Sequence, residues 1–496
     1  MKLHRPPFRS LSRQLPLRPR PCQLPASSTA AAFAALPSRV SNKFNRAYSV
    51  VSAADLRFGQ PVHETHPHIL QAGELTAGIS AQEYADRRAA VADALPDGGV
   101  AVLQAAPIVY KSGAVFHPYR QESNFLWLTG WDEPDAVAVI RKTGPNLGDY
   151  TFHMFVNPKN PREEQWNGYR NGVQAAEDIF NADESFPIDA AGSLLPRLLS
   201  SAKSVYADMP PTNAPTKFSW RELGSHEPRP SSSPLSPLVN KLRAIKSPAE
   251  VANMRKAGQM SGRAITEAMR RQWTKEKELH AFLDYQFIMN GCDGPAYIPV
   301  IAGGERANCI HYTVNNDVFN KDEFILVDAG GQYGTYITDI SRTWPCSGKF
   351  SPAQRDLYEA VLKVQRDSVS LCRADARMSL EDIHSATTRG LVEQLKTIGF
   401  DVNMSNIGQL FPHHVGHYIG LDVHDCPTYS RRELLRPGHC VTVEPGIYVP
   451  DNEQWPSHFR GMGVRIEDSI CVDETSPFIL TTEAVKEVSD IEALRD

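Results

Sequence analysis

The chain has 496 residues, of which 41% are hydrophobic and 22% are charged, so it is long enough for two or three domains with large buried cores. Its charge is divided unevenly. Residues 1–50 hold nine basic side chains and no acidic one, whereas the remainder holds 43 basic and 57 acidic side chains. An acidic body argues against general nucleic-acid binding. No apolar run approaches the ~18 residues that span a bilayer, so we expect no integral membrane segment.

Residues 1–48 have the composition of a mitochondrial transit peptide, because they are rich in Arg, Ser and Ala and lack acidic residues. A basic tail with another role is the alternative. The segment runs into Arg46-Ala47-Tyr48-Ser49, which resembles a cut by the matrix processing peptidase that leaves an N-terminal Tyr for a second trimming step. We expect the mature protein to begin near Tyr48 or Ser49. Its expected place is the mitochondrial matrix, either free or held loosely on the inner membrane.

Residues 64–208 are predicted to form an α/β domain. A polar helix is expected from Ser80 to Leu95. Strands are expected at four short apolar runs, Val100–Leu103, Phe125–Leu128, Ala136–Ile140 and His153–Val156. Seven prolines between Pro210 and Pro237 then predict a linker over 209–240.

Residues 241–496 are predicted to form an α+β domain. The motifs Ser247-Pro-Ala-Glu250 and Ser351-Pro-Ala-Gln354 each place a capping residue before a helix that begins with Pro. Strand-like runs follow at Phe324–Val327, Cys440–Val443 and Val464–Ile466. The eight cysteines include no CxxC pair, which favours reduced core thiols over disulfides or a structural zinc site.

Two aspartates follow one another across a predicted hairpin. The apolar run that ends in Asp328 turns through three glycines and returns as Tyr336–Arg342, which predicts two antiparallel strands with Asp328 and Asp339 side by side. Each Asp taken alone also suits a strand end or a turn.

Four histidines, His413, His414, His417 and His424, fall within twelve residues. The i, i+4 spacing of His413 and His417 would suit two ligands on a helix, but nearby glycines weaken a helix, so a zincin-type site is not predicted. One metal-binding histidine is the modest interpretation, and a structural cluster is the alternative.

Two glutamates end the series. Glu444 closes a strand before Pro445-Gly446, where a plain turn is the alternative. Arg465 and Glu467 share one face of the next strand, where an exposed ion pair is the alternative. If the four carboxylates meet, like charges at close range require cations between them. Oxygen donors with one imidazole suit Mn²⁺, Co²⁺, Fe²⁺ or Zn²⁺, and two such metals can share and activate a water.

These motifs together resemble the pita-bread metallopeptidases in residue type, order and spacing. The resemblance rests on Asp328, Asp339, His417 in HxxGHxxGLxxHD, Glu444 in VEPGIY and Glu467 in VRIED. Upstream, Tyr119–Trp131 resembles the N-terminal domain of the creatinase and aminopeptidase P branch, and Gln60–His68 with the transit peptide resembles its mitochondrial intermediate-cleaving members.

The resemblance implies a role for each residue. The position of Asp328 chelates one metal, those of Asp339 and Glu467 bridge two, and those of His417 and Glu444 bind the second. Glu444 also matches the general base. By the same resemblance, His311 and His424 orient substrate and stabilise the tetrahedral intermediate, His413 lines the substrate pocket, and Arg465 partners a ligand carboxylate.

The implied function is a dinuclear metallo-aminopeptidase, with Mn²⁺ expected first. It would remove one N-terminal residue from mitochondrial precursors already cut by the processing peptidase. The alternatives are a general Xaa-Pro aminopeptidase, a prolidase-type dipeptidase or, outside enzymes, a non-catalytic binding module. The expected partners are peptide or protein N-termini and copies of the same chain, as a dimer or tetramer, and no nucleic acid is expected.

Overall fold

The structure is a computed structural model that describes residues 57–208 and 231–496. The predicted transit peptide, residues 1–48, and residues 209–230 of the predicted linker lie outside the described residues. Two parts are described in turn below, residues 57–243 and residues 244–496.

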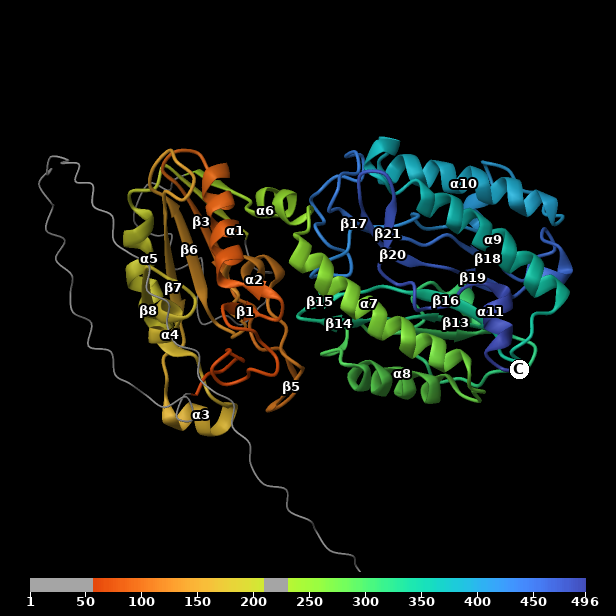
Figure 1. The fold of residues 1–496 in the computed structure, drawn as a ribbon, viewed down its shortest axis with the longest axis horizontal. Coiled ribbons are helices and arrows are strands. Elements are labelled where there is room, and N and C mark those ends of the chain that lie inside the picture. The colour runs from red at the N-terminus through yellow and green to blue at the C-terminus, as the bar shows by residue number, and fades with distance from the viewer. Residues whose placement is uncertain (1–56, 209–230) are drawn as a thin grey trace, which may run out of the picture. The chain divides into compact units, whose positions relative to one another are not determined.

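A six-stranded mixed sheet forms the centre of the first part (Figure 1). Its strand order is β10-β9-β3-β6-β7-β8. The β6 strand is antiparallel to its neighbours β3 and β7, and β9, β10 and β8 add in parallel at the edges. The strands are β3 Gly99–Gln104, β6 Val137–Lys142, β7 Tyr150–Val156, β8 Glu184–Pro187, β9 Ser204–Ala207 and β10 Ser231–Ser233. Small hairpins precede and follow β3, namely β1 Glu74–Thr76 with β2 Ile79–Ser80, and β4 Tyr110–Ser112 with β5 Val115–Phe116.

The helices of this part are α1 Ala81–Ala94, α2 Ser123–Thr129, α3 Pro161–Asn167, α4 Gly172–Asp178, α5 Ala191–Leu199 and α6 Ser236–Arg243. The helix expected from Ser80 to Leu95 is confirmed, with Ser80 as its N-cap. The strand expected at Phe125–Leu128 is wrong, because these residues lie in α2. The Glu122 carboxylate accepts the N–H groups of Asn124 and Phe125, and Gly130 ends the helix in a left-handed conformation with φ 68°. The run is apolar all round because α2 is buried on every side.

The second part consists of short antiparallel sheets between helices. Its strands are β11 Gly294–Pro295, β12 Val300–Gly303, β13 Phe324–Asp328, β14 Gly331–Tyr333, β15 Tyr336–Ile337, β16 Ser341–Pro345, β17 Cys440–Val443, β18 Gly446–Tyr448, β19 Gly463–Arg465, β20 Asp468–Val472 and β21 Pro477–Ile479. The expected strands at Phe324, Cys440 and Val464 are therefore confirmed. In one sheet β13 pairs with β12 and β16, and in another β20 pairs with β17 and β21.

Five helices complete this part, α7 Pro248–Met269, α8 Glu276–Asn290, α9 Pro352–Ser370, α10 Leu380–Thr397 and α11 Val488–Ala493. Figure 1 shows strands of this part between the α7–α8 pair and the α9–α10 pair. Both predicted start signals are confirmed, since Ser247 and Ser351 each form a capping box at the N-termini of α7 and α9. None of the helices in the described ranges is both long and apolar enough to cross a membrane.

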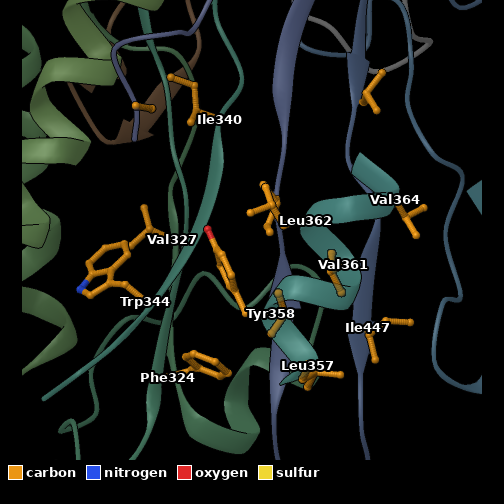
Figure 2. Close-up of a cluster of buried hydrophobic side chains, with 14 of the residues drawn as sticks. Phe324, Val327, Ile340, Trp344, Leu357, Tyr358, Val361, Leu362, Val364 and Ile447 are labelled. Carbon is orange, nitrogen blue, oxygen red and sulfur yellow. The ribbon is translucent and has the colours of Figure 1, made fainter. Parts of the chain in front are cut away.

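Helix α9 contributes a large share of the core of the second part. Figure 2 shows Tyr358 of α9 pointing toward the strands that carry Val327 and Trp344. These side chains and Leu357 are at most 1% exposed. The packing fixes β13 and β16 against α9, and with them the strand ends that bear the candidate site. The seven cysteines of the described residues are free thiols, six buried and Cys309 exposed, in keeping with the expectation of reduced core cysteines.

Candidate metal centre and active site

Asp328 and Asp339 lie side by side at one end of the β13–β16 pair, as predicted. Asp328 is the last residue of β13 and lies opposite Ser341, the first residue of β16. The Tyr297 hydroxyl is 2.8 Å from Asp328 Oδ1 and 2.5 Å from Asp339 Oδ1, so one phenol joins the two carboxyl groups. The three glycines between them allow the β14–β15 hairpin, which turns at Gly334 with φ 55°.

His417 lies in an irregular segment, so the expectation that this region is not a helix is confirmed. Its Nδ1 is 3.0 Å from the Tyr418 carbonyl oxygen, which can only accept a hydrogen bond, so the proton of the neutral ring is on Nδ1. The other nitrogen, Nε2, is 3.5 Å from Asp339 Oδ2 and 3.7 Å from Glu444 Oε1. The free lone pair therefore points at the carboxylates, as in a metal-binding histidine.

Glu444 and Glu467 come from the neighbouring strand pair. Val443, the last residue of β17, is opposite Asp468, the first residue of β20, so Glu444 and Glu467 flank one end of this pair. Glu467 is 1% exposed and accepts a hydrogen bond from the Ser341 hydroxyl at 2.7 Å. Its other oxygen, Oε1, is buried and has no hydrogen-bond partner among the described residues.

Arg465 is a buried side chain that binds the candidate ligand Asp328 and two neighbouring hydroxyl groups. It is 1% exposed, so the alternative of an exposed ion pair with Glu467 is wrong. Its guanidinium donates to Asp328 Oδ2 at 2.7 Å, to the Ser341 hydroxyl at 2.8 Å and to the Tyr448 hydroxyl at 2.8 Å. Tyr448 in turn lies 2.9 Å from His413 Nε2. Because His413 Nδ1 faces the His414 carbonyl at 2.9 Å, its Nε2 accepts the Tyr448 proton.

His311 and His424 lie at the open side of the cluster. Both side chains are exposed. The His424 ring centroid is 4.3 Å from that of His417, with the planes at 71°. Partial burial lowers the pKa of His424, and the nearby His417 ring lowers it further.

The carboxylates repel one another, and this repulsion helps to shift their pKa values. Burial raises the pKa of Glu444 to about 7, and repulsion from Asp339 and Asp328 adds to this effect. Burial and the neighbouring Asp339 raise the pKa of Asp328 to about 6. Burial and the other three carboxylates raise the pKa of Glu467 well above its ordinary value. For Asp339, burial also acts upward, but the neighbouring His417 ring and the Tyr297 hydroxyl leave its pKa lowered. A cation among these oxygens would relieve the repulsion.

The residues fit divalent metal ions. One ligand atom from each of Asp339, His417 and Glu467 lies within 4.8 Å of the other two. Asp328 and Glu444 adjoin this group, and Glu467 Oε1 is a buried oxygen to which no residue of ranges 57–208 and 231–496 donates a hydrogen bond. Carboxylate oxygens and an imidazole nitrogen are the donor set of Mn²⁺, Co²⁺, Fe²⁺ and Zn²⁺.

Three residues of the site were not identified from the sequence. Tyr297, Ser341 and Tyr448 hold the carboxylates and His413 through single hydroxyl groups. Tyr and Ser are common in strands and loops, and nothing in their local pattern marks them. Only the fold brings them to the ligands.

Comparisons with known proteins agree with this geometry. Residues 252–474 match metallopeptidase family M24, and residues 84–206 match the aminopeptidase P N-terminal domain. The chain is 46% identical over 448 residues to intermediate cleaving peptidase 55 of Saccharomyces cerevisiae, covering 88% of each chain. It is 37% identical over 459 residues to human Xaa-Pro aminopeptidase 3, covering 88% of this chain and 90% of the relative.

Solved structures show the same fold. The crystal structure of the Saccharomyces cerevisiae peptidase Icp55 with 58 N-terminal residues deleted has a TM-score of 0.81 and 44% identity, covering 86% of this chain and 99% of that one. Aminopeptidase P from Escherichia coli with the inhibitor Pro-Leu has a TM-score of 0.76 and 32% identity, covering 84% and 98%. The expected pita-bread fold with an aminopeptidase P-type N-terminal domain is confirmed. The chain therefore belongs to metallopeptidase family M24 and is a metallo-aminopeptidase that acts with divalent metal ions.

Proposed function

We propose that this metallo-aminopeptidase removes a single residue from the N-termini of mitochondrial precursors that the matrix processing peptidase has already cut. The observation that carries the proposal is the cluster of five candidate ligands, Asp328, Asp339, His417, Glu444 and Glu467, in a chain that aligns with intermediate cleaving peptidase 55 over most of its length. We propose two domains with the boundaries 64–208 and 241–496, but residues 231–240 of the expected linker 209–240 instead carry β10, which pairs with β9, and the first residues of α6.

The metal ligands are assigned by the family resemblance. Asp328 would hold one ion and His417 and Glu444 the other, with Asp339 and Glu467 available to both. We propose Mn²⁺ as the metal because four carboxylates make the donor set hard. When bound, the two ions lower the pKa of a shared water and polarise the substrate carbonyl.

Each remaining side chain has a distinct task. Glu444 accepts the proton of the attacking water. His424 and His311 are exposed at the open side and donate hydrogen bonds to the carbonyl oxygen of the substrate as charge develops there. His413 lines the pocket and is fixed by Tyr448 at 2.9 Å. Arg465 holds Asp328 in place at 2.7 Å.

The proposed place of action is the mitochondrion. The Arabidopsis thaliana relative, 32% identical over 464 residues, is named intermediate cleaving peptidase 55, mitochondrial, which supports this assignment. We place the protein in the matrix, in contact with the inner membrane at most, and as a dimer or tetramer. The sequence Arg46-Ala47-Tyr48-Ser49 has the form of a substrate, so we propose that the chain trims itself or another copy. An intact N-terminal Tyr48 on the mature protein would contradict self-trimming.

The second candidate is a general Xaa-Pro aminopeptidase, which the name of the human relative favours. Mass spectrometry separates the candidates. Metal-loaded protein is incubated with a Tyr-Ser peptide, an Ala-Pro peptide of equal length and the dipeptide Ala-Pro, beside a Glu444→Gln control. Release of Tyr only by the unmodified protein supports the intermediate-cleaving role. Cleavage of the Ala-Pro peptide alone identifies a classical Xaa-Pro specificity, cleavage of the dipeptide alone a prolidase, and no cleavage with any metal a binding module.

A further inference from the structure

His424 needs support from its surroundings, because it is exposed and its loop has no regular structure. We define the His424 loop as residues 418–426. His424 stands with its ring centroid 4.3 Å from that of His417. The next residue, Asp425, has a side chain only 1% exposed. These two neighbours therefore face different environments, one the site and the other the protein interior.

The His424 loop is closed by its own backbone. The Asp425 N–H donates to the Tyr418 carbonyl at 2.8 Å, and the Gly420 N–H donates to the Asp422 carbonyl at 3.1 Å. The Asp422 N–H also donates to Asp425 Oδ1 at 3.3 Å. Gly420 packs closely here, since a Cβ at this position would lie 2.6 Å from Asp425 Oδ2 and 2.7 Å from Lys246 Cε.

Two cations enclose Asp425, Arg243 at the end of α6 and Lys246 in the segment that joins α6 to α7. Lys246 Nζ lies 2.8 Å from Asp425 Oδ2, and Arg243 Nη2 bonds Asp425 Oδ1. The side chains of Arg243 and Lys246 are 3% and 2% exposed. These cations outweigh the effect of burial and lower the pKa of Asp425, so the carboxylate stays ionised inside the protein. A buried charge with two fixed partners resists displacement, because moving it would leave uncompensated charges in a dry interior.

The N-terminal part of the chain also contacts this cluster. Arg243 Nη1 donates to Asn124 Oδ1 at 2.6 Å, and the Ser123 hydroxyl donates to Asp422 Oδ1 at 2.7 Å. Ser123 and Asn124 are the first two residues of α2 and are buried. Helix α2 therefore contacts the His424 loop directly through Ser123 and indirectly through Asn124, which bonds Arg243.

We infer that Asp425, held by Arg243 and Lys246, is a positioning residue that fixes the His424 imidazole beside His417, and that Ser123 of α2 takes part through Asp422. The inference rests on the proposed function, in which His424 contacts the substrate carbonyl. It adds an element to that function, since the N-terminal domain then contributes to catalysis through contacts within the same chain.

The principal test compares Asp425→Asn with unmodified protein and with Glu483→Gln. The Glu483→Gln change breaks a half-buried ion pair, with Arg255 Nη1 at 2.6 Å, without touching the His424 loop. For Asp425→Asn at equal metal content we expect kcat to fall about 10- to 100-fold, since misplacement of a reacting group by ~1 Å costs about this much. KM and bound metal should change less than about twofold, because Asp425 touches neither substrate nor the candidate ligands. Glu483→Gln should leave kcat unchanged.

Hydrogen exchange of the metal-free protein gives a readout independent of activity. Peptides that cover the His424 loop should exchange faster in Asp425→Asn, whereas peptides of α9 should not change. If Asp425→Asn does not fold, Ser123→Ala replaces it as the test. This variant should show the same increase in exchange, confined to the His424 loop, and a smaller fall in kcat. Unchanged loop exchange, or a uniform increase over the whole chain, would overturn the inference.

The His424→Ala variant separates failure of the inference from failure of the proposed function. If it retains full kcat, the role of His424 in the proposed function is wrong, and the exchange experiment still tests whether Asp425 orders the loop. If it loses kcat while Asp425→Asn keeps both kcat and loop protection, the proposed function stands and the positioning role is refuted.

Discussion

Replacing Ser341 by Ala should weaken metal binding without removing a ligand. The Ser341 hydroxyl is fully buried and has one proton. Because Arg465 Nε donates to its oxygen at 2.8 Å, that proton goes to Glu467 Oε2 at 2.7 Å. The substitution therefore removes a hydrogen bond that fixes one carboxylate oxygen of Glu467 and leaves Arg465 Nε without its acceptor.

Two estimates of the effect agree. A hydrogen bond to a charged group contributes ~1.5–3 kcal/mol. Loss of a partner that orients a metal ligand lowers metal affinity about 10- to 100-fold, which corresponds to ~1.4–2.8 kcal/mol. We expect the dissociation constant of Ser341→Ala for Mn²⁺ or Co²⁺ to rise within that range in a competition titration against a fluorescent chelator.

Ser368→Ala is the matched control for this measurement. Ser368 is 2% exposed and its hydroxyl makes two hydrogen bonds at 2.7 Å, to the Val364 carbonyl and to Thr387, away from the candidate ligands. It should lose stability but keep metal affinity. The reasoning is refuted if Ser341→Ala binds metal within about twofold of the unmodified protein, or if both variants lose affinity equally.

Three further predictions concern stability. The raised pKa values of Glu444, about 7, and Asp328, about 6, favour the metal-free fold at low pH and cost stability as the pH rises from about 4 to 7. Metal should therefore raise the unfolding temperature more at about pH 7.5 than at about pH 5. Equal increases in unfolding temperature at the two pH values would contradict this sign. Leu357→Ala empties a fully buried position and should lower the free energy of unfolding by ~2–5 kcal/mol in urea titrations, and a loss below ~1 kcal/mol would mean that the core closes around the cavity. Ser351→Ala removes the cap of α9 and should cost ~1 kcal/mol in the same assay, whereas a change indistinguishable from zero would show that the cap is dispensable.

The sequence predicted the elements whose signals are local. Capping boxes at Ser247 and Ser351 and the apolar runs before Asp328 and Glu444 depend on a few adjacent residues, and they form as expected. The error at Phe125–Leu128 has a physical cause. A short apolar run without polar alternation fits a buried strand and a buried helix equally, and the choice was made by the Glu122 cap and by Gly130.

The candidate ligands could be proposed from sequence because each stands at a strand end or beside glycines, in a motif with several chemistry-bearing residues. The residues that support these ligands could not be proposed from the sequence. Tyr297 lies between α8 and β12, and its link to Asp328 and Asp339 depends on the register of β13 with its neighbours. Asp425 is adjacent to His424 in the sequence, but its partners Arg243 and Lys246 are 182 and 179 residues away, a separation that no local pattern spans.

The two strand pairs that carry the cluster also bear on the order in which the molecule is assembled. Asp328 and Asp339 belong to the β13–β16 pair, and Glu444 and Glu467 to the β17–β20 pair, with α9 and α10 between them in the chain. Each pair can form from residues that are close in sequence, and repulsion among four carboxylates arises only when the pairs dock. We therefore expect the carboxylate charges to oppose docking, which joins residues distant in the chain, and a divalent cation to favour it. The ions that serve the hydrolysis would then also stabilise the folded form of the half of the chain that binds them.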